Sequence, residues 1–171
     1  MPAVVEIDAA ELEGLALSLN VDRETMLAAA KTAANRAIAW ARVQVARGLS
    51  ERLGVRQESL EKRLRPRKAE GKNTRASLWI ALNPLNAERA NPTKTATGLR
   101  AGNRDFPGAF LARGRYGGRV AVRRKGAART PLEAASFDVM AIAPQAITRG
   151  TWPGLNDRFI AFYQEELEAR R

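Results

Sequence analysis

The chain contains no histidine and no cysteine, the residue types that supply most catalytic bases, thiolate nucleophiles and transition-metal ligands. Carboxylates remain, and Asp105, Glu133 and Asp138 are those nearest the predicted strands. Their spacing pairs none of them into an acid–base or two-metal arrangement, and Ser136 has no base beside it. We therefore expect neither catalysis nor a cofactor or metal. A metal-dependent hydrolase or nuclease that uses Asp105 or Asp138 is the enzymatic alternative.

Positive charge is concentrated between Arg104 and Arg124, where six arginines and one aspartate surround the apolar run "FPGAF". Guanidinium groups bind phosphates and the carboxylates of acidic protein surfaces. The stretch is therefore a candidate contact with DNA or with a neighbouring subunit, and a solvated basic face is the alternative. The candidate contact residues are Arg104, Phe106, Pro107, Gly108, Phe110, Arg113, Arg115, Arg119, Arg123, Arg124 and Lys125.

Charge is also unevenly distributed along the whole chain. Its 29 basic and 18 acidic residues give a net charge of +11, but residues 1–30 carry −5, residues 31–130 carry +18 and residues 131–171 carry −2. A basic centre between acidic ends attracts polyanions or an acidic surface of another protein. The acidic ends and the basic centre could also attract each other between subunits, or the polarity could be incidental.

A hydrophobic content of 45% in 171 residues indicates one globular domain with a substantial core. The first residues, "MPAVVEIDAAELEG", lack the basic segment and apolar run of a secretory signal. No stretch approaches the roughly 18 apolar residues of a membrane span. We therefore expect a soluble protein of the cytoplasm that has no membrane partner.

The N-terminal part, residues 1–65, is predicted to be helical. A short helix is expected over Asp8–Leu19, and a long one from the N-cap Asp22 to Leu53, ended by Gly54. Val55–Arg65 predicts another short helix that Pro66 ends, and its Glu58 and Glu61 argue against a DNA-reading role. The predicted apolar stripe of the long helix is mostly alanine: Leu27, Ala30, Ala34, Ala37, Ile38, Ala41, Val45 and Leu49.

Residues 76–143 are predicted to form a small antiparallel sheet, after a loop over 66–75. Ala76–Leu82 alternates like a strand, and residues 83–103 lack any period, so we expect a mobile loop there. Three glycines in "GRYGG" predict a hairpin of Gly108–Arg113 with Arg119–Arg123, its Val120 and Val122 pointing inward and Ala121 outward. The remaining predicted elements are a strand over Phe137–Ile142 and a C-terminal helix within 151–171 with Leu155, Phe159, Phe162 and Leu167 facing the core.

The expected fold is therefore α+β over the whole of 1–171: N-terminal helices, a small antiparallel sheet with a basic hairpin, and a C-terminal helix packed on the sheet. The order of these features resembles the minor tail protein Z family of tailed bacteriophages and prophages, the lambda-type tail-completion proteins. The resemblance spans Arg23 to Phe162 and rests on "AANRAIAWARVQVARGL" with its Asn35-Arg36 pair, on "VRQESLEKRLRPRKA", and on "FPGAFLARGRYGGRVAVRRKG".

The resemblance implies a structural virion protein that completes the head-proximal end of the tail and supports head–tail joining and DNA passage. Its implied partners are the tail terminator, the head–tail connector and further copies of itself in a ring, with non-specific contact to genomic DNA in addition. The chain departs from the lambda form in the insert Asn83–Asn103 and in a less basic run before the hairpin. A free-standing, non-specific DNA-binding protein is the alternative function.

Overall fold

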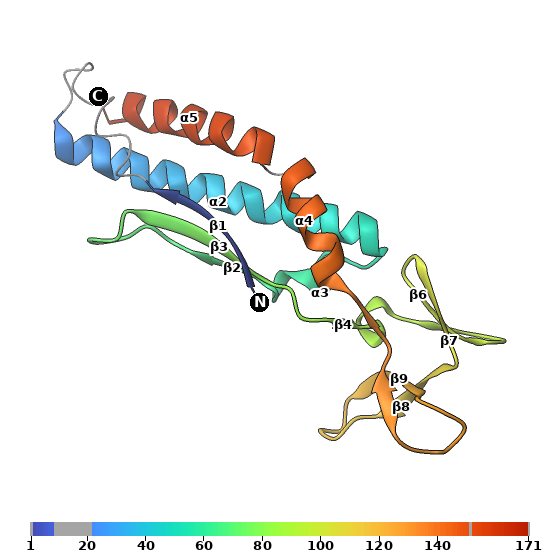
Figure 1. The fold of residues 1–171 in the computed structure, drawn as a ribbon. Coiled ribbons are helices and arrows are strands. Elements are labelled where there is room, and N and C mark those ends of the chain that lie inside the picture. The colour runs from blue at the N-terminus through green and yellow to red at the C-terminus, as the bar shows by residue number, and fades with distance from the viewer. Residues whose placement is uncertain (1, 9–21, 151, 171) are drawn as a thin grey trace.

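The computed structural model describes residues 2–8, 22–150 and 152–170, and these form the mixed α+β fold expected from the sequence. Long helices and a three-stranded sheet make up one end of an elongated molecule, and short strands make up the other (Figure 1). In chain order the elements are β1 (Pro2–Asp8), α2 (Arg23–Leu53), α3 (Glu58–Glu61), β2 (Leu64–Arg67), β3 (Arg75–Ala81), β4 (Leu85–Asn86), the 3-10 helix η2 (Ala87–Ala90), β5 (Thr93–Thr95), β6 (Gly98–Ala101), β7 (Arg104–Pro107), β8 (Ala109–Arg113), β9 (Arg119–Arg124), β10 (Leu132–Ala134), β11 (Ser136–Phe137), α4 (Val139–Gly150) and α5 (Trp152–Glu168).

The long helix α2 begins and ends as predicted. The Asp22 side chain accepts a hydrogen bond from the Thr25 amide at 2.9 Å, and Gly54 adopts the left-handed conformation with φ 64°. Its buried face is wider than the predicted stripe, because the sheet lies along one side of α2 while α4 and α5 lie along another (Figure 1). Met26, Ala29, Ala33 and Ala46 are therefore also buried, whereas Leu27 is only half-buried.

The sheet beside α2 has the strand order β1-β3-β2 and is antiparallel throughout. The strand expected over Ala76–Leu82 is confirmed as β3, the central strand of this sheet, and Leu78 and Ile80 are fully buried in it. The strand β1 corrects the expectation that residues 1–65 are helical: it alternates between buried Val5 and exposed Val4 and Glu6. Of the helix expected over Asp8–Leu19, only Asp8 is described, as the last residue of β1, and the rest lies outside the described residues.

The helix expected over Val55–Arg65 shrinks to the four residues of α3. Leu64, predicted to face inward, is indeed buried, but in β2, where it pairs with Ile80 of β3. Pro66 does not end a helix: it pairs with Leu78 inside β2, an edge strand that tolerates a residue without an amide hydrogen. The loop expected over residues 66–75 therefore begins only after Arg67.

Residues 83–103 are not the long loop that we expected. They contain β4, η2, β5 and β6, and β6 pairs with β7 so that Leu99, only 1% exposed, faces Phe106. The segment lacks apolar alternation because its strands are short and bury few side chains. Within it only β4 pairs with a distant strand, β11, while β5, β6 and β7 pair with their neighbours along the chain.

The C-terminal third also departs from the expected order. Only Ser136–Phe137 is a strand, and helix α4 replaces the rest of the strand expected over Phe137–Ile142. Pro144 lies within α4, and Asp138 caps that helix by accepting a hydrogen bond from the Ala141 amide at 3.1 Å. Among the residues that the structure describes, no helix is long and apolar enough to cross a bilayer.

The C-terminal helix forms as predicted but packs elsewhere. Leu155, Phe159 and Leu167 of α5 are buried, while Tyr163 takes the buried place expected for Phe162. The helix α5 lies on α2, on the side away from the sheet, so α2 separates α5 from the strands (Figure 1). A long helix that is covered on both sides needs small side chains, which accounts for its many alanines.

Candidate interaction surface

The predicted basic hairpin forms one edge of a small sheet of order β10-β9-β8, which we call the hairpin sheet. It lies at the end of the molecule remote from the C-terminus (Figure 1). Its inner face carries Ala109 and Ala121, which are 5% and 0% exposed. The prediction that Val120 and Val122 point inward is wrong: both are half-buried, and Ala121, expected outside, is in the core.

The Asn86 side chain anchors the backbone of β9 at Ala121. Its amide nitrogen donates to the Ala121 carbonyl and its oxygen accepts from the Ala121 amide, both at 2.9 Å. The two bonds hold the backbone of β9 beside η2, at the residue whose side chain has no exposed surface. Sequence reasoning missed Asn86, and its only local signal is that an asparagine precedes the turn that it caps.

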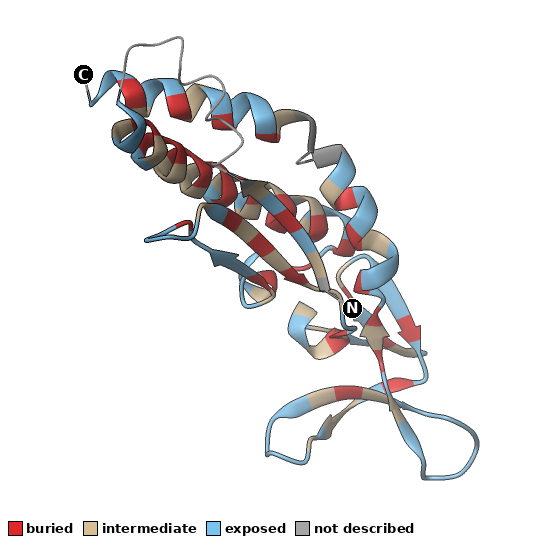
Figure 2. Cartoon of the chain, turned by 60° about the vertical axis from the view of Figure 1, so that its left-hand side comes forward, coloured by how far each residue is buried: buried red, intermediate tan, exposed pale blue. Residues whose placement is uncertain are grey.

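The outer face of the hairpin sheet is apolar and accessible. Phe110 lies opposite Val122, which lies opposite Ala134 of β10, so these side chains share one face. Phe110 is 37% exposed and Leu132 is 43% exposed, and Figure 2 shows the hairpin sheet mainly in the colours of exposed and intermediate residues. Among the residues that the structure describes, no element packs on this face to bury it.

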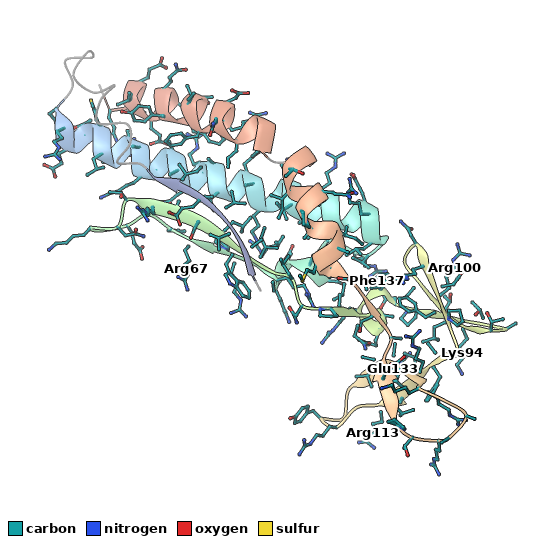
Figure 3. All side chains as sticks on the ribbon, viewed as in Figure 1. Arg67, Lys94, Arg100, Arg113, Glu133 and Phe137 are labelled. Carbon is teal, nitrogen blue, oxygen red and sulfur yellow. The ribbon has the colours of Figure 1, made fainter. Side chains whose placement is uncertain are left out.

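The cations in and next to the hairpin sheet divide into those with a partner inside the fold and those without one among the described residues. Arg123 forms an ion pair with Glu133 of β10, and Arg104 lies over the Phe106 ring with its guanidinium carbon 5.6 Å from the ring centre. Within the described part of the chain, the other cations have no carboxylate within 4 Å: Arg113, Arg115, Arg119, Arg124, Lys125 and Arg129. Figure 3 shows Arg113 pointing away from the body of the molecule.

The apolar run "FPGAF" divides between the core and the surface. Phe106 is 7% exposed and meets Phe137 edge-on at 5.3 Å between ring centres, so it anchors β7 and is not available for contact. Gly108 has φ 70° and its amide donates to the Thr97 carbonyl, which turns the chain from β7 into β8. Phe110 alone supplies an exposed aromatic ring.

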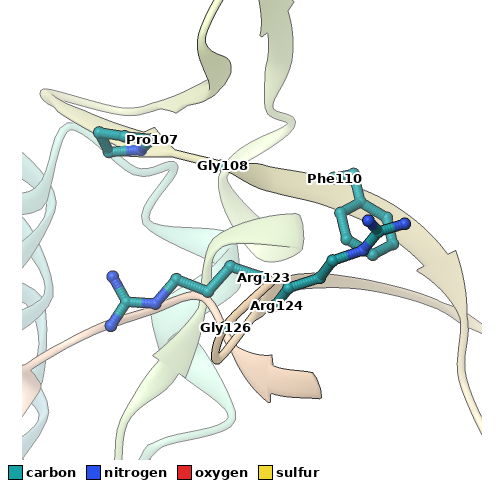
Figure 4. A pocket seen from close by; sticks show the side chains of 6 residues that line it. All are labelled: Pro107, Gly108, Phe110, Arg123, Arg124 and Gly126. Atoms are coloured by element: carbon teal, nitrogen blue, oxygen red, sulfur yellow. The ribbon is translucent and has the colours of Figure 1, made fainter. Parts of the chain in front are cut away.

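A shallow hollow of about 430 Å³ lies beside this turn. Pro107, Gly108, Phe110, Arg123, Arg124 and Gly126 line it. The side chains of Arg123 and Arg124 extend in opposite directions from β9, since successive residues of a strand point to opposite faces (Figure 4). Arg124 therefore shares the outer face with Val122 and Phe110, where an exposed ring and a cation stand side by side as in many protein-binding surfaces.

The candidate carboxylates are separated by the fold. Asp105 lies 3.9 Å from Arg100 on the neighbouring strand, Glu133 pairs with Arg123, and Asp138 caps α4. Within the described ranges, no three carboxylates come together as a group that could hold a metal ion. The arrangement of these three residues is that of ion pairs and a helix cap.

The Asn35-Arg36 pair joins the elements around α2. Asn35 accepts from the Ala69 amide at 2.8 Å and donates to its carbonyl at 3.0 Å, which holds the turn between β2 and β3. Arg36 lies over the Phe162 ring at 4.2 Å and bonds Glu165 and Glu166 of α5. The pKa of the Arg36 guanidinium is raised, and the largest cause is the hydrogen bond with Glu165. These roles are internal to the fold.

The candidate surface is thus the end of a hairpin sheet with unpaired cations and an open apolar face. Comparison of the chain with models of protein families, with curated protein sequences and with solved structures finds no match.

Proposed function

We propose that the chain is a structural subunit of a tailed-phage particle that completes the head-proximal end of the tail and works as a ring. In this role the hairpin sheet docks onto a neighbouring subunit. The sequence resemblance to the minor tail protein Z family suggests the particle and the place in it. The exposed cations and apolar residues of the hairpin sheet suggest how the subunit is held there.

The observation that carries the proposal is the chemistry that the fold leaves unused at this end of the molecule. Six cations have no carboxylate partner within the described residues, and Phe110 and Leu132 are exposed on the same sheet. Cations on a protein surface are hydrated by water and need no partner, but exposed rings and aliphatic groups beside them are characteristic of protein contacts. An acidic surface with apolar side chains at its centre is the partner that this combination fits.

Charge reversal at Arg119 and Arg124 tests the proposal. Both are exposed and have no carboxylate partner in the part of the chain that the structure describes, whereas reversal of Arg123 would also place two carboxylates together at Glu133. Assembly with the Arg119→Glu/Arg124→Glu chain should give at least about tenfold fewer joined head–tail particles. The reason is that negative charges of the variant then face the acidic surface of the partner. Electron microscopy counts joined particles, and mass spectrometry gives the copy number of the chain per particle.

The matched control is Arg67→Glu/Lys72→Glu. It changes the net charge equally, at exposed residues on β2 and in the turn after it. Figure 3 shows Arg67 far from the hairpin sheet. Particles with the control chain should join normally. Normal joining with the hairpin variant, or a chain that is missing from wild-type particles, would overturn the proposal.

A second candidate function is free-standing, non-specific DNA binding, and the same unpaired cations favour it. In that case the purified chain binds duplexes of unrelated sequence with similar affinity. The logarithm of the affinity falls by about 0.9 per neutralised phosphate for each tenfold rise in salt concentration. Mobility-shift titrations at several salt concentrations measure this slope. A steep slope, together with absence of the chain from particles, would favour this candidate over the structural subunit.

A further inference from the structure

A second hollow, of about 500 Å³, lies where the helical end of the molecule meets the short strands. The buried ring of Phe137 is in its lining, together with Leu82, Pro84 and Met140. Met140 is 59% exposed, although it is a large apolar residue. The hollow is thus mainly apolar, accessible, and large enough for an aromatic side chain.

The rim of this hollow is polar and acidic. Asp138 lines it, and among the residues that the structure describes no cation lies within 4 Å of its carboxylate. Asn83 and Ser136 also line the hollow and offer hydrogen-bonding groups. An occupant with an aromatic body, a hydroxyl tip and a neighbouring positive charge would satisfy all of these groups.

The tip of the basic hairpin has that chemistry. Tyr116 lies in the turn between β8 and β9 and is 94% exposed, so it makes almost no contact with its own chain. Arg115 precedes it, and its guanidinium has no carboxylate partner within the described part of the chain. Tyrosine and arginine are the residue types most enriched among those that dominate binding energy in protein interfaces.

We propose that Tyr116 of one copy of the chain enters the hollow of a second copy, where Arg115 meets Asp138. A second copy is the occupant because both surfaces belong to the same chain, the cation Arg115 complements the carboxylate of Asp138, and the exposed ring of Tyr116 complements the apolar lining. The exposure of Tyr116 shows that they do not meet within one molecule. The inference rests on the proposed function only in treating the hairpin as a docking element.

The contact joins two different patches, so it is heterologous, and a pair of copies keeps one free hairpin and one free hollow. Repetition of such a contact builds a closed ring or an open filament. A ring is the form that a subunit stacked on a tail tube requires.

Sedimentation velocity of the purified chain tests the contact. The wild type should associate as its concentration rises to about 100 μM, where an interface with a micromolar Kd is populated. Tyr116→Ala, which removes the ring, and Met140→Lys, which places a cation in the hollow, should each weaken association at least about tenfold. Tyr116→Phe and Met140→Leu are the matched controls and should associate nearly as the wild type does.

Mixing the two defective variants gives the decisive result. Tyr116→Ala keeps an intact hollow and Met140→Lys keeps an intact hairpin, so one productive contact can form between them. The equimolar mixture should therefore contain dimers and nothing larger, because neither outer end of the pair can extend. Both substituted side chains are exposed, and unchanged circular dichroism and melting temperature would show that each variant is folded.

A wild type that stays monomeric, a Tyr116→Ala chain that associates normally, or a mixture without dimers would each overturn the inference. The assay uses no phage particle, so it fails independently of the proposed function. A chain that associates in this way but is missing from virions contradicts only the proposed function. A virion subunit whose purified form stays monomeric contradicts only this contact.

Discussion

Glu166 accepts hydrogen bonds from arginines in two different parts of the chain, Arg170 just beyond the end of α5 and Arg36 of α2. The first bond stays within one turn of the chain, while the second joins two helices that are far apart in the sequence. Both contacts lower the pKa of Glu166, and the hydrogen bond with Arg170 lowers it more than the hydrogen bond with Arg36 does. Glu166 is therefore a residue whose ionisation supports the packing of α5 on α2.

The stability of the protein should fall in acid partly through this group. The pKa of Glu166 is about 4.5 when unfolded and lower when folded, so its contribution is present above pH 4.5 and lost as the pH falls through the folded value. Urea unfolding between pH 7 and pH 3 should show a steeper loss for the wild type than for Glu166→Gln. Glu168→Gln, at an exposed position on the same helix, is the control, and parallel curves for wild type and Glu166→Gln would contradict this role.

At the scale of elements, α2 organises the helical end of the molecule. The sheet β1-β3-β2 lies on one side of α2, and α4 and α5 lie on another. Ala37, with no exposed surface, belongs to a buried face whose small side chains let neighbouring elements approach closely. Ala39, two residues further along the same helix, is exposed.

Enlarging these two alanines should have different consequences. Ala37→Leu should lower the free energy of unfolding by about 1–3 kcal/mol, because the added atoms have no space in a packed core. Ala39→Leu, with nearly the same change in helix propensity, should stay within about 0.5 kcal/mol of the wild type. Urea unfolding monitored by circular dichroism measures both values. Equal effects would mean that the packing around α2 is loose.

For the whole molecule, two asparagines hold the outlying parts to the centre. Asn86 brackets the backbone of Ala121 in the hairpin sheet, and Asn35 brackets that of Ala69 in the turn between β2 and β3. Each makes a donor and an acceptor bond to the backbone of one residue, so substitution by alanine removes two hydrogen bonds. The two sites lie at different ends of the molecule and serve as controls for each other.

Hydrogen exchange should distinguish the two sites. Asn86→Ala should raise exchange in β8, β9 and β10 and leave α2 protected, because the hairpin sheet has few buried side chains of its own. Asn35→Ala should raise exchange around residues 68–74 and leave the hairpin sheet unchanged. Mass spectrometry of peptic peptides measures both patterns. Uniform changes across the chain would show that the molecule opens only as a whole.

The sequence by itself determined the elements whose signals are local. Asp22 and Gly54 mark the ends of α2, alternation marks β3, and three glycines mark the turn of the hairpin. It also located the concentration of arginines, since charge is a property of the residues themselves. These features follow from the backbone preferences of single residues and from periods within one segment.

Only the tertiary structure decided which side of the hairpin is buried and which arginines are free. Asn86 holds the backbone of Ala121 from 35 residues away, and Glu133 pairs with Arg123, while Arg119 and Arg124 have no carboxylate partner among the described residues. Pairing with distant strands likewise created β1, which pairs with β3, and β4, which pairs with β11. Such contacts depend on partners that a local pattern does not contain, because the energy of a short strand comes mainly from what it packs and pairs against.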